Sequence, residues 1–222
     1  MCSKDNIDII MEKIAETFAN DSKPLISKEK WEGVPKTPFT VLISCLLSLR
    51  TKDEITEKAT MKLLVNHYNP KEILKLSEKE IQSLIYPVGF YKVKAKRIKE
   101  ISKILLDEYQ GNVPSTLKEL IKINGIGRKT ANIVMVYGYN KQDYLPIDTH
   151  CHRIPNRIGW ISTKTAHETE IELKKILPKP YWKDFNHLFV LFGQNICTPL
   201  SPYCSICPIK SYCEQNGVKK HR

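Results

Sequence analysis

Four cysteines in the C-terminal part of the chain have a spacing typical of metal ligands. Cys197, Cys204, Cys207 and Cys213 are separated by six, two and five residues. Four thiolates on one short segment can hold either a tetrahedral zinc ion or an iron–sulfur cluster, and the spacing alone does not distinguish them. A disulfide framework is typical of small secreted chains, whereas this sequence has 222 residues and begins without an apolar signal segment. We therefore expect a metal or cluster site.

A second candidate site is the run Gly125-Ile126-Gly127-Arg128-Lys129-Thr130. Glycines let the backbone approach a ligand closely, and the first N–H groups of the helix predicted to follow have no partner within that helix. Such a helix start can bind phosphate, and Arg128 adds positive charge. The pattern is typical of a helix-hairpin-helix, which holds a DNA backbone without reading its sequence. A plain corner between two helices would contain the same glycines.

The same run does not fit the phosphate-binding loop of nucleotide hydrolases. That loop needs a glycine directly before its lysine and a strand in front of it. Here Arg128 separates Gly127 from Lys129, and the preceding residues have a helical pattern. We reject that interpretation.

Asp148 begins another predicted helix, about 20 residues after Lys129. An aspartate at a helix start is usually an N-cap, whose carboxylate accepts hydrogen bonds from the first backbone N–H groups. Considered alone, Asp148 indicates a cap. What makes Asp148 a candidate functional residue is its pairing with Lys129.

The overall charge favours a polyanionic partner. Lys and Arg total 35 and Asp and Glu total 24, which gives a formal net charge of +11. This excess fits nucleic acid or an anionic membrane surface, although a lysine-rich solvated surface would give the same number. The longest apolar run, residues 39–49, is about half of the ~20 residues that a membrane span needs. We expect no membrane segment and no export.

The elements that must position these residues are helices, because apolar residues recur at helical spacing and strict alternation is almost absent. The pattern predicts an all-α fold. Capping boxes are predicted at Thr51–Glu54, opening a helix to about Tyr68, and at Ser77–Glu80. Pro155 should bend its helix or limit its start. The remaining predicted helices cover residues 8–19, 38–49, 91–109, a short one from 116, 128–137, 148–158, 165–177 and 181–194.

From about residue 39 to residue 213, the chain resembles the endonuclease III branch of the helix-hairpin-helix DNA glycosylases. The landmarks are Leu46-Leu47-Ser48, Val88-Gly89-Phe90-Tyr91, the run from Gly125 to Asn132, Ile147-Asp148-Thr149-His150 and the four cysteines. The resemblance implies a [4Fe–4S] cluster rather than zinc. It also implies two helical domains: a six-helix barrel over residues 31–141 that contains the hairpin, and a cluster domain built from residues 1–30 and 142–222. DNA would lie in a groove between them.

The resemblance further implies a base-excision repair enzyme that removes oxidised or damaged pyrimidines. Lys129 would attack the sugar, expel the base and form a Schiff base, and β-elimination would then cleave the strand on the 3′ side. Asp148 would stabilise the cationic sugar and shuttle protons. The partner would be duplex DNA containing a damaged base or an abasic site. We expect a monomer in a prokaryotic cytoplasm, associated with the nucleoid.

The expected DNA contacts include two departures from the family pattern. The family type has Gln where Arg50 stands and Leu where Phe90 stands, both filling the gap left by the flipped base. Arg50 could face the orphaned partner base and Phe90 could wedge between base pairs, although Phe90 could equally be a core residue. The remaining expected DNA contacts are Gly125, Ile126, Gly127, Arg128, Thr130 and His150.

Two alternatives stay open. One is a monofunctional glycosylase for mismatched thymine, uracil or adenine, which the presence of Lys129 argues against. The other is a DNA-binding module whose cluster senses redox state without catalysis, which the Lys129 and Asp148 pair argues against. Nicking of abasic-site DNA without added metal would distinguish an enzyme from a binding module.

Overall fold

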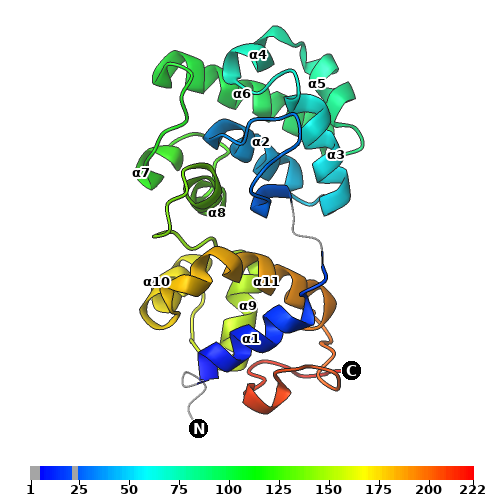
Figure 1. The fold of residues 1–222 in the computed structure, drawn as a ribbon, viewed down its shortest axis with the longest axis vertical. Coiled ribbons are helices and arrows are strands. Elements are labelled where there is room, and N and C mark those ends of the chain that lie inside the picture. The colour runs from blue at the N-terminus through cyan, green and yellow to red at the C-terminus, as the bar shows by residue number, and fades with distance from the viewer. Residues whose placement is uncertain (1–5, 22–24) are drawn as a thin grey trace. The chain divides into compact units, whose positions relative to one another are not determined.

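A computed structural model describes residues 6–21 and 25–222, and this part of the chain is helical, without strands (Figure 1). Residues 1–5, part of the N-terminal segment in which we expect no export signal, lie outside the described residues. No helix among the described residues combines the length and apolar character needed to cross a membrane. The helices are α1 Ile7–Thr17, α2 Pro38–Ser48, α3 Asp53–Leu64, α4 Pro70–Lys75, α5 Glu78–Ile85, α6 Tyr91–Tyr109, α7 Leu117–Leu120, α8 Arg128–Ile133, α9 Thr149–Ile158, α10 Ala166–Ile176 and α11 Trp182–Asn195.

The chain forms two compact units, each with its own hydrophobic core. One is Lys23–Tyr144, and the other joins Met1–Ser22 to Leu145–Arg222. In the first unit α2 is the central helix, because most of its residues are buried and apolar, and it contacts α3, α6 and α8. In the second unit α9 contacts both α10 and α11, and α1 also contacts α11.

Local sequence signals account for most helix ends. The predicted capping box at Ser77 is present, with Ser77 Oγ accepting from Glu80 N and Glu80 Oε2 accepting from Ser77 N. Helix α6 covers the predicted residues and ends at Tyr109. Its C-cap, Gln110, is left-handed, and the Gly111 N–H donates to the Leu105 carbonyl. Pro155 lies inside α9, whose bounds are close to those predicted.

The predicted capping box at Thr51 is wrong. Helix α3 starts at Asp53 with Lys52 as its N-cap, and no side chain caps it. The Thr51 hydroxyl instead accepts hydrogen bonds from Gly89 N (3.1 Å) and Lys94 Nζ (3.0 Å). A tertiary contact has therefore replaced the local one that the sequence pattern favoured. The helix also ends at Leu64 rather than near Tyr68.

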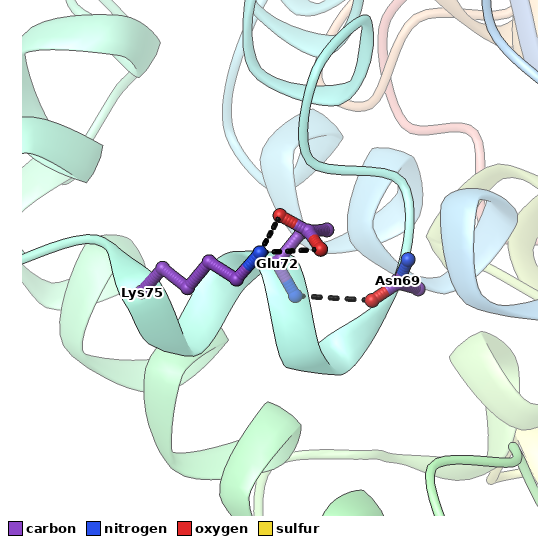
Figure 2. A network of polar contacts seen from close by, with 3 residues as sticks. All are labelled: Asn69, Glu72 and Lys75. Carbon is purple, nitrogen blue, oxygen red and sulfur yellow. Dashed lines mark hydrogen bonds and ion pairs between the residues drawn. The ribbon is translucent and has the colours of Figure 1, made fainter.

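Helix α4 was not predicted, although its signals are local. Pro70 occupies the first turn, and Asn69 Oδ1 accepts a hydrogen bond from Glu72 N at 3.0 Å. Figure 2 shows this cap together with the Lys75 ammonium, which lies 2.8 Å from the Glu72 carboxylate one turn away. This ion pair lowers the pKa of Glu72. An Asn-Pro pair before a short apolar pattern is the signal that could have identified this helix.

Candidate functional site

The glycine-rich run forms a tight turn between α7 and α8. Gly125 has φ +92°, which favours glycine, and a Cβ there would lie 2.5 Å from Arg97 Cδ. Gly127 is the N-cap of α8 and is exposed, and a Cβ there would meet nothing within 4 Å. Ile126 is buried in the core and anchors the turn. The turn therefore presents backbone around Gly127 to the surface, next to a helix start that favours anions.

Lys129 is the second residue of α8 and is half-buried. It lies close enough to the buried thiol of Cys45 on α2 to affect its ionisation: burial raises the pKa of Cys45, and the Lys129 charge opposes that shift. The next side chain, Thr130, is buried and accepts a hydrogen bond from Cys45 Sγ at 3.7 Å. Lys129 is therefore more exposed than Thr130, which packs inward against α2.

Asp148 is the N-cap of α9, as an aspartate at that place predicts. Its Oδ1 accepts hydrogen bonds from His150 N (2.9 Å) and Cys151 N (2.8 Å). These two bonds fix the direction of a half-buried carboxylate at the positive end of a helix. The His150 ring packs against Gly193, and its Nδ1 is 3.2 Å from Arg153 Nη2.

Arg50 and Phe90 line one pocket together with Gly125 of the hairpin turn. Phe90 is 61% exposed, so the core interpretation of this residue is wrong. The Arg50 guanidinium carbon lies 5.8 Å from the centre of the Phe90 ring, a cation–π distance. Sequence reasoning missed two basic residues in the same pocket, Lys94 and Arg97.

The four cysteines also line one pocket, whose other walls are mostly apolar and include Phe192, Ile196 and Ile209. Two N–H groups point at sulfur: Arg157 Nη1 donates to Cys197 Sγ and Gln215 N donates to Cys213 Sγ, each at 3.4 Å. Burial, with a smaller effect from the neighbouring thiols, raises the pKa of Cys207 to about 11. In the described residues no three His, Cys, Asp or Glu side chains are grouped to hold a single metal ion.

Comparison with known proteins identifies the family. The model of the HhH-GPD superfamily base excision DNA repair proteins matches residues 43–179. Endonuclease III of Thermotoga maritima is 50% identical over 177 residues, covering 80% of this chain and 83% of that protein. Endonuclease III of Rickettsia prowazekii is 37% identical over 206 residues, covering 92% and 94%. The chloroplastic endonuclease III homolog 2 of Arabidopsis thaliana is 45% identical, and the match spans 47% of its length.

Solved structures agree. A trapped endonuclease III–DNA covalent intermediate, an estranged-adenine complex, has a TM-score of 0.80 at 30% identity and 97% coverage of both chains. A thermostable thymine-DNA glycosylase shares the fold, with a TM-score of 0.79 at 23% identity. The chain therefore belongs to the endonuclease III family, within the HhH-GPD superfamily of base excision DNA repair proteins.

Proposed function

We propose that this protein is a bifunctional DNA glycosylase and abasic-site lyase with Lys129 as its nucleophile. Proteins of the endonuclease III family are base-excision DNA glycosylases, and family membership supplies the general activity. The observation that carries the finer proposal is an amine at the second residue of α8, directly after the Gly125–Gly127 turn. A backbone phosphate held at that turn would bring the sugar of a flipped nucleotide toward this amine.

The proposed reaction has two stages. The Lys129 amine forms a bond to the sugar C1′ while the bond from C1′ to the base breaks, and the base leaves with the bonding electrons and a proton. Opening of the sugar ring then gives a Schiff base between Nζ and C1′. The cationic imine acidifies the C2′ hydrogen, and loss of that proton expels the 3′ phosphate oxygen. The strand is cut on the 3′ side of the lesion.

Asp148 is proposed to act on the developing positive charge of the sugar. Its carboxylate is fixed by two backbone N–H groups through Oδ1, so it needs little reorganisation when charge appears. The same carboxylate could carry the protons that Schiff-base formation and elimination exchange.

The cysteine segment is proposed to hold a [4Fe–4S] cluster. Four sulfur donors line one pocket, and the N–H groups of Arg157 and Gln215 directed at sulfur would stabilise thiolates. When bound, such a cluster crosslinks residues 197–213 and contributes folding free energy to the unit that contains α9.

The proposed substrate is duplex DNA with an oxidised or otherwise damaged pyrimidine, or with an abasic site. The net charge of +11 supports a polyanionic partner. The similarity to bacterial endonuclease III proteins supports action in the cytoplasm, on nucleoid DNA.

Borohydride trapping tests the role of Lys129. Borohydride reduces a Schiff base, so the wild-type protein should become covalently attached to DNA carrying an oxidised pyrimidine. Lys129→Gln keeps size and polarity without a nucleophilic amine, and it should bind the same duplex but lose trapping, base release and strand cleavage. Lys122→Gln is the matched control, because Lys122 is an exposed lysine on the other side of the turn. Efficient trapping of Lys129→Gln would show that another amine is the nucleophile.

A further inference from the structure

Lys94 is a buried lysine whose ammonium group donates hydrogen bonds to three oxygen atoms. Only 8% of the residue is exposed. Its Nζ donates to the carbonyls of Leu47 (2.8 Å) and Leu49 (2.6 Å) and to Thr51 Oγ1 (3.0 Å). Burial lowers the pKa of Lys94 to about 8, which is still above neutral pH. At neutral pH the donors and acceptors therefore match in number.

Thr51 extends this contact to a second turn. Its Oγ1 accepts from Gly89 N at 3.1 Å as well as from Lys94, and lies 3.3 Å from the Leu49 carbonyl, to which it can donate. Gly89 also packs tightly, because a Cβ there would lie 2.7 Å from the Arg50 carbonyl. Lys94 and Thr51 thus join the turn after α2, residues 49–52, to the turn before α6, residues 86–90.

The joined turns carry two exposed residues of the pocket, Arg50 and Phe90, whose backbones are both left-handed. Arg50 has φ 53° and Phe90 has φ 57°. Such values are uncommon for residues other than glycine and persist where surrounding contacts hold them. The two side chains lie within cation–π distance of each other. Holding both turns together fixes the relative placement of these two groups before any DNA arrives.

We propose that Lys94 is a positioning residue whose hydrogen bonds hold the two turns together. We refer to this connection as the lock. Arg50 and Phe90 would then contact a DNA lesion from relative positions that are already fixed in the free protein. This proposal rests on the proposed function, because it assigns Arg50 and Phe90 to the space left by a flipped base. Without these hydrogen bonds, Arg50 and Phe90 would have to become ordered when DNA binds. The conformational entropy lost on ordering them would weaken recognition of the lesion. Contacts to phosphate would be unaffected.

The experiment measures the ratio of affinities for an abasic-analogue duplex and an undamaged duplex. Lys94→Met keeps the aliphatic length without the donors, and should lower this ratio about tenfold, equivalent to about 1.4 kcal/mol. The affinity for undamaged DNA should change less than about twofold. Thr51→Val, which removes the shared acceptor, should lower the ratio in the same direction. Circular dichroism and thermal unfolding would confirm that each variant is folded.

Lys99→Met is the matched control. Lys99 lies on the same helix and donates to the Leu76 carbonyl, so it ties α6 to a turn that carries neither Arg50 nor Phe90. This variant should keep the wild-type ratio. If Lys99→Met lowered the affinity ratio as much as Lys94→Met does, any lysine hydrogen bond from α6 to a neighbouring turn would have the same effect. That result would overturn the proposal.

A double-mutant cycle separates positioning from general destabilisation. In an Arg50→Ala/Phe90→Ala background the lock has nothing to position, so adding Lys94→Met should leave the ratio unchanged. The proposal would be overturned if Lys94→Met lowered the affinity ratio equally in both backgrounds. It would also be overturned if Lys94→Met did not lower the ratio in the wild-type background. Failure of the proposed function would look different, because the wild-type protein itself would then show no preference for the abasic duplex.

Discussion

At the residue scale, Asp148 shows how one side chain can be both a helix cap and a candidate catalyst. Its Oδ1 accepts from His150 N and Cys151 N, so the cap interpretation is confirmed by the structure. The cap is compatible with the proposed chemistry, because the two hydrogen bonds from backbone N–H groups hold the carboxylate in one orientation. The proposed catalytic role needs a carboxylate that is oriented in advance.

Two substitutions of Asp148 should separate these roles. Asn caps helices as well as Asp, so Asp148→Asn should change the free energy of unfolding little, whereas Asp148→Ala should cost about 1 kcal/mol. Both remove the charge near the sugar, so both should slow base excision by about 100-fold or more. On a ready-made abasic site, where base loss is bypassed, Asp148→Asn should retain more borohydride trapping. Near wild-type excision by Asp148→Asn would exclude the proposed role.

At the element scale, the hairpin depends on packing rather than on helix propensity. Helices α7 and α8 have four and six residues, too few to be stable alone. They are held because Leu120, Ile123 and Ile126 are buried in the core of the unit. A π-helical turn, Val134–Gly138, continues α8 and contacts α2. The exposed turn can therefore keep a fixed shape while presenting backbone to a ligand.

Gly127→Val tests the phosphate interaction of this turn. A Cβ at Gly127 meets nothing in the protein, and its φ of −81° is accessible to any residue, so the variant should fold normally. The added side chain would keep a phosphate away from the backbone N–H groups. Binding to damaged and undamaged duplexes should weaken alike, and the slope of log K against log salt should become shallower by about 0.9 for each phosphate lost. An unchanged salt slope would argue against phosphate binding here. Gly125→Ala is unsuitable as a test, because the φ of +92° at Gly125 strains any residue with a side chain.

At the scale of the whole molecule, catalytic candidates come from both units. Lys129 belongs to the Lys23–Tyr144 unit, while Asp148 and the four cysteines belong to the other. The buried apolar residues form two separate cores, one in each unit. A change in the cysteine segment should therefore affect stability in its own unit first.

Cys204→Ser tests this separation and the proposed cluster. The variant should lose iron measured per chain, and amide hydrogen exchange should increase within residues 145–222. Exchange in the core of the Lys23–Tyr144 unit, for example in α2 and α6, should remain slow. Stoichiometric zinc without iron in the wild-type protein would contradict the proposed cluster, and equal loss of protection in both units would contradict the independence of their cores.

The catalytic roles of Lys129 and Asp148 were inferred from the family resemblance and stay a proposal. The helical class, most helix ends and the turn before Lys129 were predictable from sequence patterns. These depend on local interactions: apolar spacing selects a helix, Ser77 and Asp148 cap one, and glycines permit a tight turn. The tertiary fold was needed to show that Phe90 is exposed, that Thr51 accepts a hydrogen bond from Gly89 and that Lys94 is buried among oxygens. Lys94 lies one helical turn before the buried Ile98, on the apolar face of α6. A lysine at that place was the sequence signal that could have indicated a buried lysine. Its partners are more than 40 residues away along the chain, and no local pattern specifies contacts at that separation.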